Sequence, residues 1–247
     1  MKPLINCNNV HFGVPGKKII QGINLELMPE DFLVVLGGNG SGKSSLMKLL
    51  NRVYEYTEGD IKIAGESIRA YNAKSIRQKI MTISQFINDS LFLNLTIAEN
   101  AIMIESTYAQ INKTPFKKRA FLKELPSYLD EFNPKLAKML KSRVNELSGG
   151  EQQILALALY LRAKPKLLLL DEHTSALDPK KAAAVMKYVD KVIKEQKIAC
   201  IMTTHNLDDA LKYGNKVVAI SDGEFIFEAH GAKKAKLKLN DLLEYCY

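Results

Sequence analysis

The apolar residues of the chain occur in short runs that alternate with segments of helical periodicity. The runs FLVVL at 32–36, LLLL at 167–170 and IACIM at 198–202 contain no polar position, which is typical of strands buried on both faces of a parallel sheet. Residues 44–53 and 180–196 instead carry apolar side chains at helical spacing. Strands and helices in this order predict an α/β domain with a mainly parallel sheet.

The two ends of the chain show a different, alternating pattern. LINCNNVHF at 4–12, KIIQGINLEL at 18–27, GDIKIAG at 59–65 and KVVAISDGEFIFEA at 216–229 alternate apolar and polar residues. The last segment also contains the turn dipeptide Asp222-Gly223. These segments predict antiparallel strands and hairpins that form a β-rich flank.

The middle of the chain is predicted to be helical. KKRAFLKELPSYLDEF at 117–132 and QQILALALYLRA at 152–163 have helical spacing and are candidate helices, and Pro115, Pro126 and Pro134 punctuate this part of the chain. We therefore expect a single domain over residues 1–230. Its core and flank are assigned to 1–85 and 164–230, an inserted helical lobe to 86–163, and a basic C-terminal segment to 231–247.

The composition of the chain indicates its cellular compartment and excludes several classes of protein. Cys7, Cys200 and Cys246 are odd in number and widely spaced, so no disulfide framework or zinc module is expected and a reducing cytosol fits best. No apolar run approaches the ~20 residues that cross a bilayer, and MKPLINCNNV lacks the apolar stretch of a signal peptide. The net charge of +8 permits attraction to phosphates or acidic lipids, although Lys233, Lys234, Lys236 and Lys238 are expected to form a solvated tail.

GGNGSGKS at 37–44 satisfies the phosphate-binding pattern GxxxxGK[ST] between a predicted buried strand and a predicted helix. In this context backbone N–H groups turn toward the phosphates, Lys43 reaches the β- and γ-phosphates, and the Ser44 hydroxyl ligates Mg²⁺. The sequence therefore predicts a nucleoside triphosphate with Mg²⁺. The predicted binding residues are Gly37, Gly38, Asn39, Gly40, Ser41, Gly42, Lys43, Ser44 and Ser45.

The run LLLLDEHTSALD at 167–178 ends a predicted strand with adjacent carboxylates. Ligands of open α/β sheets bind at the carboxyl ends of the strands, and successive strand residues point to opposite sides. We therefore predict that Asp171 orders Mg²⁺ and that Glu172 polarises the attacking water. Three adjacent ligands cannot readily converge on one zinc ion, so His173 is interpreted as a loop residue.

Together with LSGGEQQ at 147–153, these motifs resemble the nucleotide-binding subunits of ATP-binding cassette (ABC) transporters over nearly the whole chain. The resemblance implies the ABC ATPase fold, with ATP as the nucleotide. It further implies a head-to-tail dimer, either a homodimer or a heterodimer with a close relative, in which the signature of one subunit closes over the γ-phosphate held by the other. The signature residues are Ser148, Gly149, Gly150 and Glu151, at the capped start of a predicted helix.

The resemblance also assigns roles outside the three motifs. Gln85 matches the glutamine that senses Mg²⁺ and the attacking water, Asp178 matches the loop that crosses the dimer interface, and His205 matches the switch histidine at the γ-phosphate. Phe12 is the candidate for stacking on adenine, with Val14 as the alternative. The chain departs from the family at His173, where proline is frequent, and at Ile154, where arginine is common.

The family implies an ATPase that drives a separate membrane permease from the cytoplasmic face of the cell membrane. A single cassette without a membrane segment is similar to bacterial import systems with a separate solute-binding protein, here for an amino-acid-like solute. A soluble ABC ATPase of cofactor assembly is the alternative. A GTPase is disfavoured, because Val218 replaces the carboxylate of the guanine-reading NKxD pattern, and a small-molecule kinase would have no use for the LSGGE motif. No nucleic-acid partner is expected.

Overall fold

The computed structural model of the chain describes residues 2–72, 75–76, 79–84, 87–111, 115–172 and 177–245. It divides into two compact units. The first comprises residues 1–82, 166–172 and 197–247, and the second comprises 83–165 and 173–196. The predicted limits of the helical lobe, 86–163, stay a prediction.

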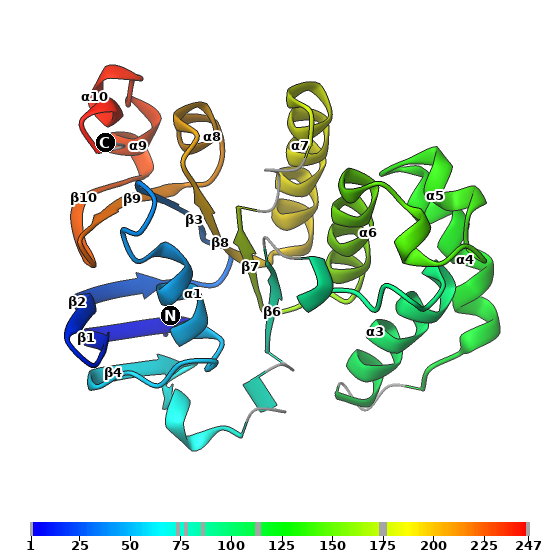
Figure 1. Cartoon of the computed structure of the whole chain (residues 1–247), viewed down its shortest axis with the longest axis horizontal. Helices are drawn as coiled ribbons and strands as arrows, with labels where there is room; N and C mark the ends of the chain where they lie inside the picture. The colour runs from blue at the N-terminus through cyan, green and yellow to red at the C-terminus, as the bar shows by residue number, and fades with distance from the viewer. Residues whose placement is uncertain are drawn as a thin grey trace. The chain divides into compact units, whose positions relative to one another are not determined.

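The first unit is built on a mainly parallel sheet with the strand order β10-β9-β3-β8-β7-β6 (Figure 1). β3 pairs in parallel with β8 and β9, β7 pairs in parallel with β8, and β10 is antiparallel to β9. The strands are β3 (Phe32–Leu36), β6 (Ile80–Ile83), β7 (Leu167–Asp171), β8 (Ala199–Thr204), β9 (Lys216–Ser221) and β10 (Glu224–His230). The three apolar runs thus form strands of one sheet, as the sequence predicts, and the structure places them as the neighbours β3, β8 and β7.

Burial explains why these runs lack polar residues. Every residue of β3 and β8 is buried, and so are the four leucines of β7. The register sets Val34 opposite Met202 on one side and Val217 on the other. Because the strands are parallel, the ends of β3, β7 and β8 meet at one edge of the sheet, where α/β folds bind ligands.

The predicted β-rich flank is a second sheet with the order β2-β1-β4-β5 (Figure 1). Its antiparallel strands are β1 (Ile5–Val14), β2 (Lys17–Leu27), β4 (Glu58–Ile63) and β5 (Glu66–Ser67). Their alternate residues, such as Ile5, Cys7 and Ile61, join one hydrophobic core with β3 and α1 (Lys43–Leu50). This unit also contains η1 (Ile68–Ala70) and α8 (Leu207–Lys212). The α/β architecture with an antiparallel flank is confirmed.

The second unit is helical. Its elements are η2 (Ile87–Asp89), α3 (Ile97–Ile111), α4 (Lys118–Asp130), α5 (Pro134–Lys138), η3 (Val144–Glu146), α6 (Gly149–Arg162) and α7 (Pro179–Gln196). Pro134 occupies the first turn of α5, as predicted. The candidate helix at 117–132 is confirmed as α4, which continues through Pro126. Phe121, Leu125 and Leu129 are buried on one face of α4, and this packing offsets the hydrogen bond that proline removes.

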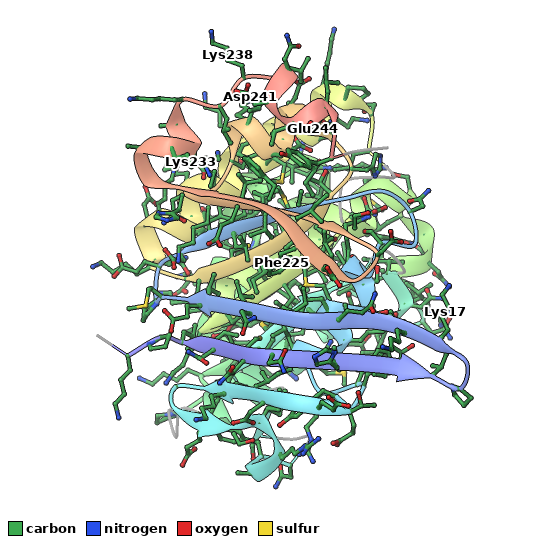
Figure 2. All side chains as sticks on the ribbon, turned by 90° about the vertical axis from the view of Figure 1, so that its left-hand side faces the viewer. Lys17, Phe225, Lys233, Lys238, Asp241 and Glu244 are labelled. Carbon is green, nitrogen blue, oxygen red and sulfur yellow. The ribbon has the colours of Figure 1, made fainter. Side chains whose placement is uncertain are left out.

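The C-terminal segment is folded, which corrects the expected lysine-rich tail. It forms α9 (Gly231–Ala235) and α10 (Asn240–Leu243), and Figure 2 labels Lys238, Asp241 and Glu244 around its last turn. Lys234 is only 7% exposed and donates to the carbonyl oxygens of Leu211 and Tyr213 at 2.8 Å each. Its ammonium therefore satisfies carbonyls at the end of α8, a position that favours cations.

Candidate functional site

The glycine-rich loop at 37–42 joins the end of β3 to the start of α1. A Cβ at Gly37 would lie 2.4 Å from the carbonyl oxygen of Ile220, so no other residue fits without a backbone shift. Gly42 has a φ of 111°, which side chains rarely adopt. The loop is therefore packed against β9 and leads its backbone directly into the N-terminus of α1.

The Lys43 side chain lies at the centre of this loop. Its ammonium donates to the carbonyl oxygens of Gly37 and Gly38 at 2.8 and 2.9 Å, and the side chain is 5% exposed. The Ser41 hydroxyl is buried beside Gly37 and has no hydrogen-bond partner among the described residues. The loop thus combines a buried positive charge with an available hydroxyl donor, as phosphate binding requires.

Asp171 ends β7 and faces the start of α1. Its Oδ1 accepts hydrogen bonds from the Ser44 hydroxyl at 3.3 Å and from the Thr203 hydroxyl at 2.6 Å. Carboxylate and hydroxyl oxygens are the ligands that Mg²⁺ prefers in proteins. The donor set of Ser44 and Asp171 therefore fits a magnesium ion, which would screen the charge of a bound phosphate.

Glu172 lies beside the same loop but has different partners. Its φ is 46°, a left-handed conformation that bends the chain sharply after β7. Its Oε1 lies 3.5 Å from the Lys43 ammonium, and its Oε2 lies 3.7 Å from Nδ1 of His205. The His205 side chain is 64% exposed, whereas that of Glu172 is 15% exposed. A carboxylate with this access can accept a proton from water.

Thr203 is a site residue that the sequence reasoning missed. Its hydroxyl donates to the Asp171 carboxylate and also accepts the backbone N–H of Glu172 at 3.2 Å, so it connects the Asp171 side chain and the Glu172 backbone to β8. It is buried. The sequence signal for this role is the pair of threonines at the end of an otherwise apolar strand, because a buried hydroxyl needs a hydrogen-bond partner.

The signature residues lie in the second unit and begin α6. Ser148 is the N-cap, its hydroxyl accepts the N–H of Glu151, and the Glu151 carboxylate accepts the N–H of Ser148. This reciprocal capping box leaves the first-turn N–H groups of Gly149 and Gly150 without intrahelical partners. Ile154 is buried in α6, so the apolar residue packs where the family commonly has arginine.

Asp178 caps α7. Its Oδ1 accepts the N–H of Lys181 at 3.1 Å, its carbonyl oxygen accepts the N–H of Ala182, and its carboxylate pairs with Lys181 at 3.1 Å. The hydrogen bond from the Lys181 N–H is the main factor that lowers the pKa of Asp178. Asp178 therefore has a structural role at the helix start, and its assigned contact across a dimer stays a prediction.

Phe12 is partly buried, and its ring stacks on Tyr54 with centroids 4.9 Å apart and planes 17° apart. One face of the candidate adenine-stacking ring is therefore covered by a residue that the sequence analysis did not select. Val14 lies at the end of β1 and is 49% exposed. Whether Phe12 or Val14 contacts the base stays a prediction.

Two predicted residues, Gln85 and His173, lie outside the described residues. Within the described part of the chain, no three metal-binding side chains form a cluster of their own.

A cleft of about 550 Å³ lies between β1, β2, β9 and β10, near Phe225 in Figure 2. Its lining residues, among those the structure describes, include no residue of the glycine-rich loop and neither Asp171 nor Glu172, so it is not the phosphate site.

This fold, with a glycine-rich loop between β3 and α1, defines a P-loop nucleoside triphosphatase. The family profile described as ABC transporter matches residues 20–175. The tyrosine transport ATP-binding protein of Clostridioides difficile is 30% identical over 235 residues, which cover 94% of this chain and 92% of that protein. The phosphonates import ATP-binding protein PhnC of Bdellovibrio bacteriovorus is 35% identical over 236 residues, covering 92% and 88%.

Solved structures agree on the fold. The dimeric ATP-binding cassette MJ0796, bound to ADP and Pi, superimposes with a TM-score of 0.78 at 24% identity and covers 92% of this chain and 98% of its own. CbiO1 of Clostridium perfringens gives 0.77 at 23% identity, covering 93% and 89%. The chain belongs to the ABC transporter family, and it is an ATP-binding ATPase. None of its described helices is long and apolar enough to span a membrane.

Proposed function

We propose that this chain is the subunit that hydrolyses Mg²⁺–ATP to drive a separate membrane permease. The main support for this proposal is that the side chains of Lys43, Asp171 and Glu172 lie close together near the ends of β3 and β7. Lys43 and the loop N–H groups bind the phosphates, and Ser44 and Asp171 hold Mg²⁺, which screens the phosphate charge. Glu172 accepts a proton from the attacking water, while His205 contacts the γ-phosphate.

A second subunit completes each site in this proposal. The capped start of α6 presents Ser148 and two glycine N–H groups, which suit an anionic phosphate oxygen. MJ0796 has been solved as a dimer with ADP and Pi, which supports the same arrangement here. ATP binding then closes the dimer, and hydrolysis through Glu172 reopens it, so that the motion is available to a permease.

The direction and cargo are also part of the proposal. A phosphonates import protein and a tyrosine transport protein are both about one-third identical to the chain, which supports solute transport, and the first of them supports import. In this proposal the chain lies at the inner face of the membrane, and a separate solute-binding protein delivers the solute to the permease. An amino-acid-like solute agrees with one relative and not with the other. Co-purification with a membrane permease supports this function, whereas co-purification with soluble cofactor-assembly proteins would overturn it.

Replacement of the proposed base tests the chemistry. Glu172→Gln keeps the size and removes the proton acceptor, so we expect turnover to fall about 100-fold or more while ATP binding is retained. Steady-state phosphate release and equilibrium nucleotide titration measure the two effects separately. Hydrolysis close to the wild-type rate would show that Glu172 is not the base.

A further inference from the structure

The Glu151 carboxylate divides its two oxygens between the signature and a neighbouring helix. Oε2 accepts the N–H of Ser148 at 2.9 Å, and Oε1 accepts the ammonium of Lys135 at 2.8 Å. The Glu151 side chain is 16% exposed and that of Lys135 is 57% exposed. The hydrogen bond from Lys135 is the largest influence on the pKa of Glu151, which is lowered, so the carboxylate is charged at neutral pH.

This charge has an electrostatic consequence at the start of α6. A carboxylate favours a helix N-terminus by itself, but a phosphate that approaches the same terminus is repelled by it. The Glu151 side chain is partly shielded from solvent, so water screens that repulsion less than it would for a fully exposed carboxylate. An anion-binding signature with glutamate at this position therefore benefits from a cation that balances the carboxylate.

The local fold fixes Lys135 in the position to do this. The Asn133 side chain caps α5 by accepting the backbone N–H of Lys135 at 3.0 Å, and Pro134 sets the first turn. Leu136, the next residue, is fully buried and anchors the helix. The short helix thus holds the lysine stem in place, which reduces the entropy lost when its ammonium pairs with Glu151.

We propose that Lys135 is a positioning residue for the signature, because its ammonium holds the Glu151 carboxylate in place and neutralises its charge. Ser148 and the first turn of α6 can then bind the γ-phosphate held by a second subunit. This inference rests on the proposed function of the signature. Lys135 itself does not contact the nucleotide in this account. It acts only through Glu151.

A double-mutant cycle tests the proposal in the hydrolysis-deficient Glu172→Gln background. Lys135→Met keeps an apolar stem and removes the charge, and Glu151→Gln keeps an acceptor for the Ser148 N–H and removes the opposite charge. We expect Lys135→Met to weaken ATP-dependent dimerisation about fivefold when Glu151 is present, the upper range for a partly exposed ion pair. When Glu151→Gln is present, Lys135→Met should change ATP-dependent dimerisation less than about twofold.

Lys138→Met is the matched control, because Lys138 is exposed on the same helix and forms no ion pair with any described residue. It should change dimerisation less than about twofold in either background. Equal losses from Lys135→Met with and without Glu151, or an equal loss from Lys138→Met, would overturn the proposal. Ser148→Arg distinguishes a failure of this proposal from a failure of the proposed function. If that variant still dimerises with ATP, the proposed role of the signature is wrong, whatever the result for Lys135.

Discussion

At the end of β7, adjacent acidic residues have different partners because the backbone turns sharply between them. Asp171 completes the strand and shares its Oδ1 with Ser44 and Thr203, whereas Glu172 has a positive φ and lies beside Lys43. The alternation of strand side chains predicts that the two carboxylates separate. It does not predict Thr203, which comes from another strand and hydrogen-bonds to the carboxylate of one and the backbone of the other.

Thr203 is expected to act as a positioning residue. Thr203→Val preserves the shape of the side chain but removes the donor to Asp171 and the acceptor for the Glu172 N–H, so kcat should fall about tenfold, in the range seen for partners of metal ligands. Thr203→Ser keeps the hydroxyl and should restore most of the activity. If the valine variant hydrolyses ATP as fast as the serine variant, the hydroxyl does not position the carboxylates.

The sequence predicts the position of individual strands and helices better than the contacts between them. Runs such as FLVVL and LLLL predict buried strands because both faces of a central strand are covered. The helix at 117–132 is also predicted by its apolar spacing, and it continues through Pro126 because packing of the α4 face outweighs the local preference of proline. The Lys135–Glu151 pair joins separate helices, so no local pattern could indicate it.

The central strands should dominate the stability of the first unit. Leu169 in β7 is fully buried, and Leu169→Ala should lower the free energy of unfolding by about 3–5 kcal/mol through lost apolar contacts and the cavity left behind. Urea unfolding followed by circular dichroism measures this change. Leu239→Ala, at a site 44% exposed, should change it by less than about 0.5 kcal/mol. A cost below about 1 kcal/mol for the Leu169 variant would mean that the site repacks without a cavity.

At the scale of the whole molecule, the proposed function assigns one phosphate-binding element to each of the two compact units. The glycine-rich loop and the acidic residues after β7 belong to the first unit, and the capped start of α6 belongs to the second. The family match identifies an ATP-binding ATPase. The proposal that a second chain supplies the signature to each loop is what turns nucleotide binding into a movement between subunits.

Complementation between two defective subunits tests that claim most directly. Lys43→Ala disables the loop and Ser148→Arg disables the signature, and both variants carry Glu172→Gln to prevent hydrolysis. Neither should form an ATP-dependent dimer alone, because each composite site in such a dimer would contain one damaged half. A mixture should form mixed dimers that retain one ATP, held by the intact loop of one chain and the intact signature of the other, as sizing chromatography with labelled nucleotide can show. A mixture that stays monomeric, or a Ser148→Arg variant that dimerises by itself, would contradict the account.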